Sequence, residues 1–75
     1  MAIDLGSVDA MDGASRAHVQ FRDETGEKVQ IYGPRRGTAD EAQKDLDAMR
    51  AAAAEFSDRA QMYEAMQVEA ARIRN

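Results

Sequence analysis

The sequence predicts a small α+β domain, in which a three-stranded antiparallel sheet packs on one α-helix that is followed by a second helix or a helical extension. Between residues 15 and 36, apolar and polar side chains alternate along two segments, as in strands that bury one face. A short turn that contains a glycine joins these segments, as in a β-hairpin. From Thr38 to Asn75 the chain has neither glycine nor proline, and its apolar residues recur every three or four positions, which favours helix.

The hairpin of residues 15–36 has one apolar face. That face consists of Ala17, Val19, Phe21, Val29 and Ile31. Gly26 lies in the turn of residues 23–27, where a hairpin loop of this length needs left-handed backbone. Because Pro34 has no amide hydrogen for a sheet ladder, the second of these strands is expected to end near Tyr32 or Gly33.

Residues 1–14 carry the weakest pattern. A strand from Ser7 to Met11 that turns at Asp12 and Gly13 would complete a three-stranded antiparallel meander. The alternative is a flexible leader, because chain termini are often mobile. Even with the strand in place, residues 1–6 could be disordered.

The helical region begins with a strong start signal. Thr38 followed by Glu41 forms a capping box, and Asp40 and Glu41 favour the positive end of the helix dipole. One apolar stripe then consists of Ala42, Leu46, Met49, Ala53 and Phe56, and a second consists of Met62, Met66, Ala70 and Ile73. The change of stripe leaves two alternatives: either Ser57 ends one helix and caps another over about residues 58–73, or a single helix continues for about 36 residues.

Size and composition describe one small folding unit. We expect a sheet-plus-helix domain over residues 1–56 and a helical extension over residues 57–75. Fifteen of the 75 residues are alanine and none is tryptophan, so the core is thin and a partner or a second copy could share in stabilising it. No apolar run approaches the ~20 residues that span a bilayer, so no membrane partner is expected. We expect a soluble, intracellular chain.

The residue types in this sequence give little reason to predict an enzyme. The chain has no cysteine and one histidine, His18, which falls on the polar strand face and is expected to be solvated. The helix carboxylates Asp40, Glu41, Asp45 and Asp47 are expected to be solvated as well, and none is paired with another in an apolar pocket. We therefore expect no enzyme, no metal site, no cofactor and no small-molecule substrate. The loop of residues 33–37 is interpreted as a connector.

The polar face of the hairpin is the most informative feature for function. It contains Arg16, His18, Gln20, Arg22, Lys28, Gln30 and Tyr32, without a carboxylate, and Arg35 and Arg36 follow it. Basic side chains on a sheet could contact phosphates, while the glutamines and arginines could reach base edges. The alternative is an ordinary solvated sheet face. The net charge of −4 argues against loose binding driven by charge alone, but not against one basic face.

Three segments carry a resemblance to a known family. They are residues 17–22 (AHVQFR), residues 29–32 (VQIY) and residues 38–42 (TADEA). Over about residues 6–55 the chain resembles the Apetala-two / ethylene-response-factor DNA-binding domain and the similar arm-binding domains of phage integrases. The resemblance implies that the polar sheet face lies in the DNA major groove and that its seven residues, Arg16, His18, Gln20, Arg22, Lys28, Gln30 and Tyr32, contact nucleic acid. Arg35 and Arg36 join the predicted site because their basic side chains could contact phosphates. It also implies a nuclear location.

A second function class stays open. The segment of residues 6–11 is neither basic nor aromatic, and the tryptophans typical of that family are absent. The alternative is therefore a structural or adaptor protein with the same fold that has lost DNA binding. Its interface with a protein partner, or with a second copy in a homodimer, would lie on the C-terminal helix at Met62, Tyr63, Met66 and Ile73.

Overall fold

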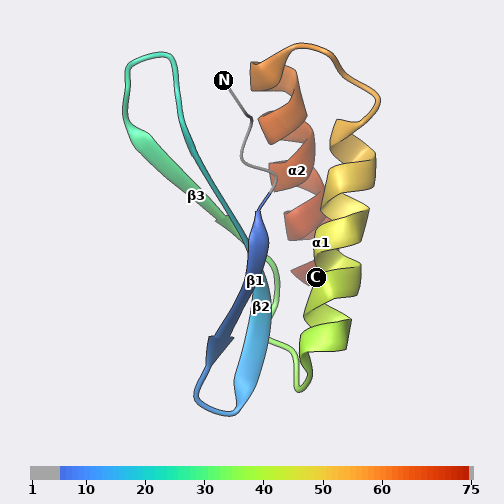
Figure 1. The fold of residues 1–75 in the computed structure, drawn as a ribbon. Coiled ribbons are helices and arrows are strands. Elements are labelled where there is room, and N and C mark those ends of the chain that lie inside the picture. The colour runs from blue at the N-terminus through green and yellow to red at the C-terminus, as the bar shows by residue number, and fades with distance from the viewer. Residues whose placement is uncertain (1–5, 75) are drawn as a thin grey trace.

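The computed structural model describes residues 6–74 and confirms the predicted α+β fold (Figure 1). The strands are β1 (Ser7–Met11), β2 (Ala14–Arg22) and β3 (Lys28–Tyr32), and the helices are α1 (Ala39–Ala53) and α2 (Arg59–Arg74). The strands form one antiparallel sheet in the order β1-β2-β3, with β2 in the centre. Both helices lie on the same side of the sheet and run antiparallel to each other (Figure 1).

The predicted first strand is present with the predicted bounds. β1 joins β2 through Asp12 and Gly13, and Gly13 has a φ of 68°, which an L side chain rarely adopts. The strand alternative to a flexible leader is therefore confirmed for Ser7–Met11. Gly6 is described as well, whereas the expected disorder of residues 1–5 falls outside the described residues.

The turn between β2 and β3 is held by the Asp23 side chain. Its Oδ1 accepts hydrogen bonds from the Thr25 amide at 2.9 Å, the Thr25 hydroxyl at 2.6 Å and the Glu27 amide at 3.0 Å. These bonds lower the pKa of Asp23, with the Thr25 hydroxyl as the largest cause and the backbone amides of residues 25–27 adding to it against a smaller opposing effect of desolvation. Gly26 has a φ of 86°, as expected for a glycine at this place in the loop.

α1 begins at the predicted capping residue. The Thr38 hydroxyl oxygen accepts from the Glu41 amide at 3.2 Å, and the Thr38 hydroxyl donates to the Glu41 carboxylate at 3.1 Å. In a standard capping box the carboxylate accepts a hydrogen bond from the backbone amide of the cap residue. Here the Glu41 carboxylate accepts from the Thr38 hydroxyl instead.

The helical region is broken, and the break differs in detail from the expectation. α1 ends at Ala53 and α2 begins at Arg59, so the single continuous helix is ruled out. Asp58, not Ser57, caps α2, because its carboxylate accepts from the Gln61 amide at 3.3 Å. Phe56 was expected on the buried stripe of α1. It is 40% exposed because it lies in the connection beyond the helix end.

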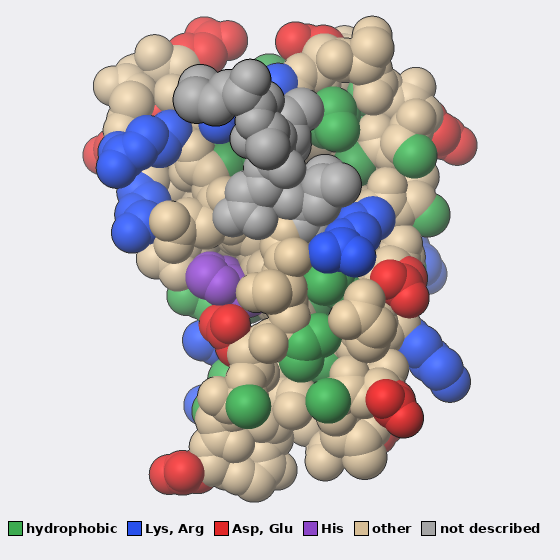
Figure 2. Space-filling view, in the orientation of Figure 1, with side chains coloured by type: hydrophobic (Ala, Val, Ile, Leu, Met, Phe, Trp, Pro, Cys, Tyr) green, Lys and Arg blue, Asp and Glu red, His purple; other side chains and the backbone are tan. Residues whose placement is uncertain are grey.

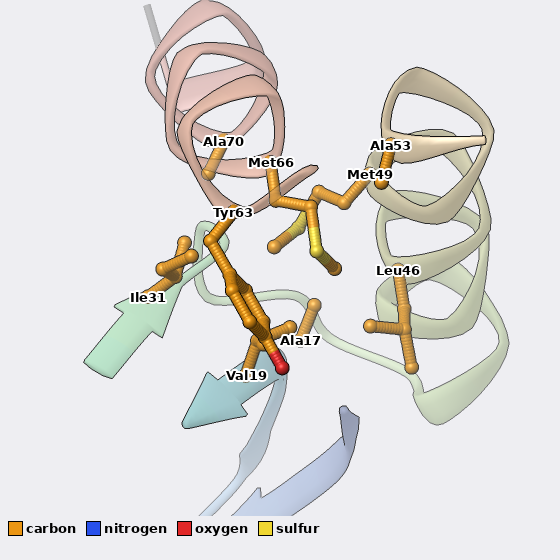
Figure 3. Close-up of a cluster of buried hydrophobic side chains, with 9 residues drawn as sticks. All are labelled: Ala17, Val19, Ile31, Leu46, Met49, Ala53, Tyr63, Met66 and Ala70. Carbon is orange, nitrogen blue, oxygen red and sulfur yellow. The ribbon is translucent and has the colours of Figure 1, made fainter. Parts of the chain in front are cut away.

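One core joins the sheet to both helices (Figure 3). It contains Ala17, Val19 and Ile31 from the sheet, Leu46, Met49 and Ala53 from α1, and Tyr63, Met66 and Ala70 from α2. The Tyr63 ring also stacks on Phe21 of β2, with ring centroids 3.9 Å apart. Because α2 supplies a third of this core, residue 56 does not separate two packing units, and residues 57–74 belong to the same domain as the sheet.

Truncation of Met66 measures this contribution of α2. Met66 is fully buried, and Met66→Ala should lower the free energy of unfolding by about 2–5 kcal/mol because it leaves a cavity between the helices and the sheet. The matched control is Val68→Ala on the same helix, where the side chain is exposed and the expected cost is within about 0.5 kcal/mol. Equal costs in urea denaturation would contradict the shared core.

The Asp23 turn predicts a specific pH dependence. Since folding lowers the pKa of Asp23, the ionised carboxylate stabilises the fold above the unfolded value of about 3.9, and this contribution is lost as the pH falls through the folded value. Asp23→Asn should therefore lower the melting temperature near neutral pH, and the difference from the parent chain should vanish in strong acid. Glu24→Gln, in the same turn, is the control and should leave the melting temperature unchanged at both pH values. A difference for Asp23→Asn that persists in acid would contradict this account.

Candidate nucleic-acid interface

The predicted polar residues share the outer face of the sheet, on the side away from the helices. Strand pairing sets His18 opposite Tyr32, Gln20 opposite Gln30 and Arg22 opposite Lys28. Arg16 lies two residues before His18 on the same face of β2. Neither helix covers this face (Figure 1). The two-residue period therefore brings seven of the nine predicted contact residues together.

Arg16, Tyr32 and His18 form a stacked group at the centre of this face. The His18 and Tyr32 rings are nearly parallel, with centroids 4.7 Å apart and an interplanar angle of 11°. The Arg16 guanidinium carbon lies 3.8 Å from the Tyr32 centroid, a cation–π contact. The Arg16 Nε is enclosed and has no hydrogen-bond partner within residues 6–74, so the aromatic face is its main support.

Both ring nitrogens of His18 have partners, although the sequence places it on the solvent-facing side of a strand. Its Nδ1 lies 3.2 Å from an Asp9 carboxylate oxygen, and its Nε2 lies 3.0 Å from Gln30 Oε1, which also accepts from the Tyr32 hydroxyl. The side chain is only 18% exposed, so the expectation of a fully solvated histidine is wrong. In Figure 2 the imidazole lies beside a carboxylate, and both basic and acidic side chains lie at the hairpin end of the sheet.

Asp9 is the member of this face that the sequence analysis missed. The two-residue period of β1 places it on the outer face, and the register sets it opposite Arg16. The signal was present in the sequence, because a two-residue turn at Asp12 and Gly13 fixes this register. The sheet face as a whole therefore contains one carboxylate.

Two cations lie at the hairpin end of the face, next to a turn that carries Asp23, Glu24 and Glu27. Arg22 and Lys28 are exposed and lie directly opposite each other. Like charges in this arrangement destabilise a sheet. The Arg22 guanidinium donates to the Gly26 carbonyl at 2.8 Å, which leaves its other nitrogens available to a ligand.

The two loop arginines differ in position and role. Arg35 is exposed, but Arg36 binds Asp45 of α1 through two bonds, from Nε at 2.7 Å and from Nη2 at 3.0 Å. Hydrogen bonding to this carboxylate raises the pKa of Arg36. Asp45 is only 7% exposed, so the expectation of a solvated carboxylate is wrong. Arg36 thus links the connection between β3 and α1 to the helix. Because its guanidinium is bound to Asp45, it does not form part of the open sheet face as predicted.

The expected partner interface on the C-terminal helix also needs correction. Tyr63 and Met66 are 2% and 0% exposed and belong to the core (Figure 3), so they are closed to a partner in the folded chain. Met62 and Ile73 are partly exposed. The spacing correctly identified apolar positions of α2, but the chain itself covers two of them.

A metal site and a membrane span are two other features that residues 6–74 could contain. This part of the chain contains no group of three or more histidine, aspartate or glutamate side chains that could hold a metal ion. No helix within it is long and apolar enough to cross a membrane. The outer sheet face, which brings together seven of the nine predicted contact residues, is the candidate site.

Comparison with known proteins identifies no family, no curated protein and no solved structure that matches this chain.

Proposed function

We propose that this chain binds double-stranded DNA through the outer face of its sheet. The observation that carries the proposal is the placing of Arg16, Arg22 and Lys28 on one face that neither helix covers. Arginine and lysine side chains bind phosphate oxygens, and phosphate contacts supply most of the affinity of such interfaces. The exposed Arg35 at the end of β3 would extend the same contact.

Charge is distributed so that a net-acidic chain could still bind DNA. Residues 38–75, which include both helices, carry eight acidic and five basic side chains. Those helices lie on the far side of the sheet from the proposed contact (Figure 1). The unfavourable opposition of Arg22 and Lys28 would be relieved by a phosphate between them.

The stacked group favours duplex DNA over single strands. Proteins that bind single strands offer aromatic faces to the bases. Here the Tyr32 ring is already in contact with His18 and Arg16, so a base would have to displace them. An antiparallel sheet can instead enter the major groove, where Gln20 and Gln30 would face base edges. The resemblance to the Apetala-two / ethylene-response-factor domain supports the same docking mode.

The adaptor hypothesis, with its interface on the C-terminal helix, is the weaker candidate. It placed the interface at Met62, Tyr63, Met66 and Ile73, and two of these four side chains are buried in the core. An adaptor role would need a different surface.

Removal of the opposed cations tests the proposal. Arg22→Ala/Lys28→Ala should weaken binding to a labelled duplex by about tenfold or more and should reduce the slope of log K against log salt by roughly two. Because the double substitution removes a like-charge pair, the fold should be retained, as circular dichroism would show. Fluorescence anisotropy at several salt concentrations measures both quantities.

The matched control removes two cations from the helices. Lys44→Ala/Arg72→Ala changes the net charge by the same amount on the helical side of the molecule and should change the affinity by less than about threefold. Equal losses for both double variants would indicate an unspecific charge effect. Absence of binding by the parent chain at low salt would reject the proposal.

Removal of the Asp9 charge should raise the affinity for DNA, whereas removal of the cations should lower it. Asp9→Asn removes the carboxylate from the sheet face while keeping an oxygen that can accept from His18. Affinity for duplex DNA should rise by about two- to fivefold at low salt, and the gain should shrink as salt is added. Asp47→Asn, on the exposed face of α1, is the control for net charge and should give a smaller gain. Unchanged affinity for Asp9→Asn would place the DNA elsewhere.

A further inference from the structure

A shallow groove lies on the helical side of the molecule, where α1 ends and α2 passes it. No strand residue lines it. Its apolar floor consists of Ala52, Phe56, Ala65 and Val68. Glu55 and Phe56, in the connection between the two helices, contribute to its lining. The groove is therefore separate from the proposed DNA-binding face.

The floor contains the large apolar side chains that the fold leaves uncovered. Phe56 and Val68 are 40% and 65% exposed, whereas the neighbouring stripe of α2 is buried in the core. Burial of exposed apolar surface by a partner is favourable by about 25 cal/mol per Å². Two such side chains in one concave surface, with small alanines between them, can receive a large apolar side chain of a partner.

The rim of the groove is acidic. Glu55, Glu64 and Glu69 line it, and no lysine or arginine does. Glu55 and Glu64 have no ion-pair partner within the described residues. Glu69 is paired with Arg72 one turn along α2, and that hydrogen bond lowers the pKa of Glu69 and keeps it ionised. At least two uncompensated negative charges thus flank the apolar floor.

We propose that this groove binds a basic amphipathic helix of another protein. The apolar face of such a helix would cover Phe56 and Val68, and lysine or arginine side chains on its flanks would meet Glu55 and Glu64. The α2 side of the groove runs from Gln61 to Glu69, about 12 Å at 1.5 Å per residue, which matches roughly two turns of a docked helix.

The same charges disfavour the other occupants. In a symmetric dimer, identical patches face each other, so the glutamates of one copy would meet those of the second. Nucleic acid would bring its phosphates against the same carboxylates. A basic helix is the occupant that complements both the apolar floor and the acidic rim, and this inference stands whether or not the sheet binds DNA.

A designed peptide pair tests the proposal. The probe is a helical peptide of about 14 residues with leucines along one face and lysines on both flanks. Its control keeps the leucines and replaces each lysine by glutamate. Titration calorimetry should show saturable binding of the lysine peptide and none of the glutamate peptide. Absence of binding by the lysine peptide, or equal binding of both peptides, would overturn the proposal.

Variants of the protein locate the binding. Glu55→Gln/Glu64→Gln should weaken binding of the lysine peptide by roughly three- to tenfold at low salt. Asp12→Asn/Asp40→Asn, in the turn between β1 and β2 and in the first turn of α1, removes the same charge away from the groove and should have less than about a twofold effect. Val68→Thr keeps the side-chain shape but makes the floor polar, and should also weaken binding.

Two further results would overturn the proposal. Equal losses for the glutamine pair and the asparagine pair would show that net charge alone attracts the peptide. A parent chain with the mass of two copies in light scattering, converted to one copy by Val68→Thr, would assign the groove to a second copy.

Discussion

The fold depends on the two-residue alternation of the central strand β2. Ala17 and Val19 have no exposed surface, while Arg16 and His18 between and beside them lie on the opposite face. Because β2 pairs with both other strands, its register fixes which side chains of β1 and β3 share each face. A shift by one residue would move the apolar set into water and the cations into the core, so burial of one face and the basic character of the other have a single cause.

The small size of the chain explains why α2 is part of the domain. A core with no tryptophan and many alanines gains little from one helix, so Tyr63 and Met66 of α2 close the remaining space over the sheet. The Tyr63 ring stacks on Phe21 near the end of β2. Both helices are thereby held on one side, and the outer sheet face stays open for a ligand.

Local patterns in the sequence were sufficient for the strands, the turns and the start of α1. Each depends on neighbouring residues, such as Gly13 in its turn or Thr38 with Glu41. The errors concern contacts between distant segments. Asp45 was expected to be solvated, but the loop before α1 places Arg36 against it. Asp9 lies on the outer sheet face because β1 pairs with β2 in this register. Helical spacing likewise indicated that Met66 is apolar but not which surface covers it. The outer face could thus be predicted as a set of residues, but not its internal contacts.

The most direct test of the central claim is a residue-by-residue map of the proposed DNA contact. Backbone and side-chain NMR spectra of the isotope-labelled chain would be recorded as duplex DNA is added at low salt. Our account predicts that signals of Arg16, His18, Arg22 and Lys28 shift together and saturably, while those of α1 and α2 that face away from the sheet stay in place. Shifts confined to the helices, with the sheet face unchanged, would contradict it.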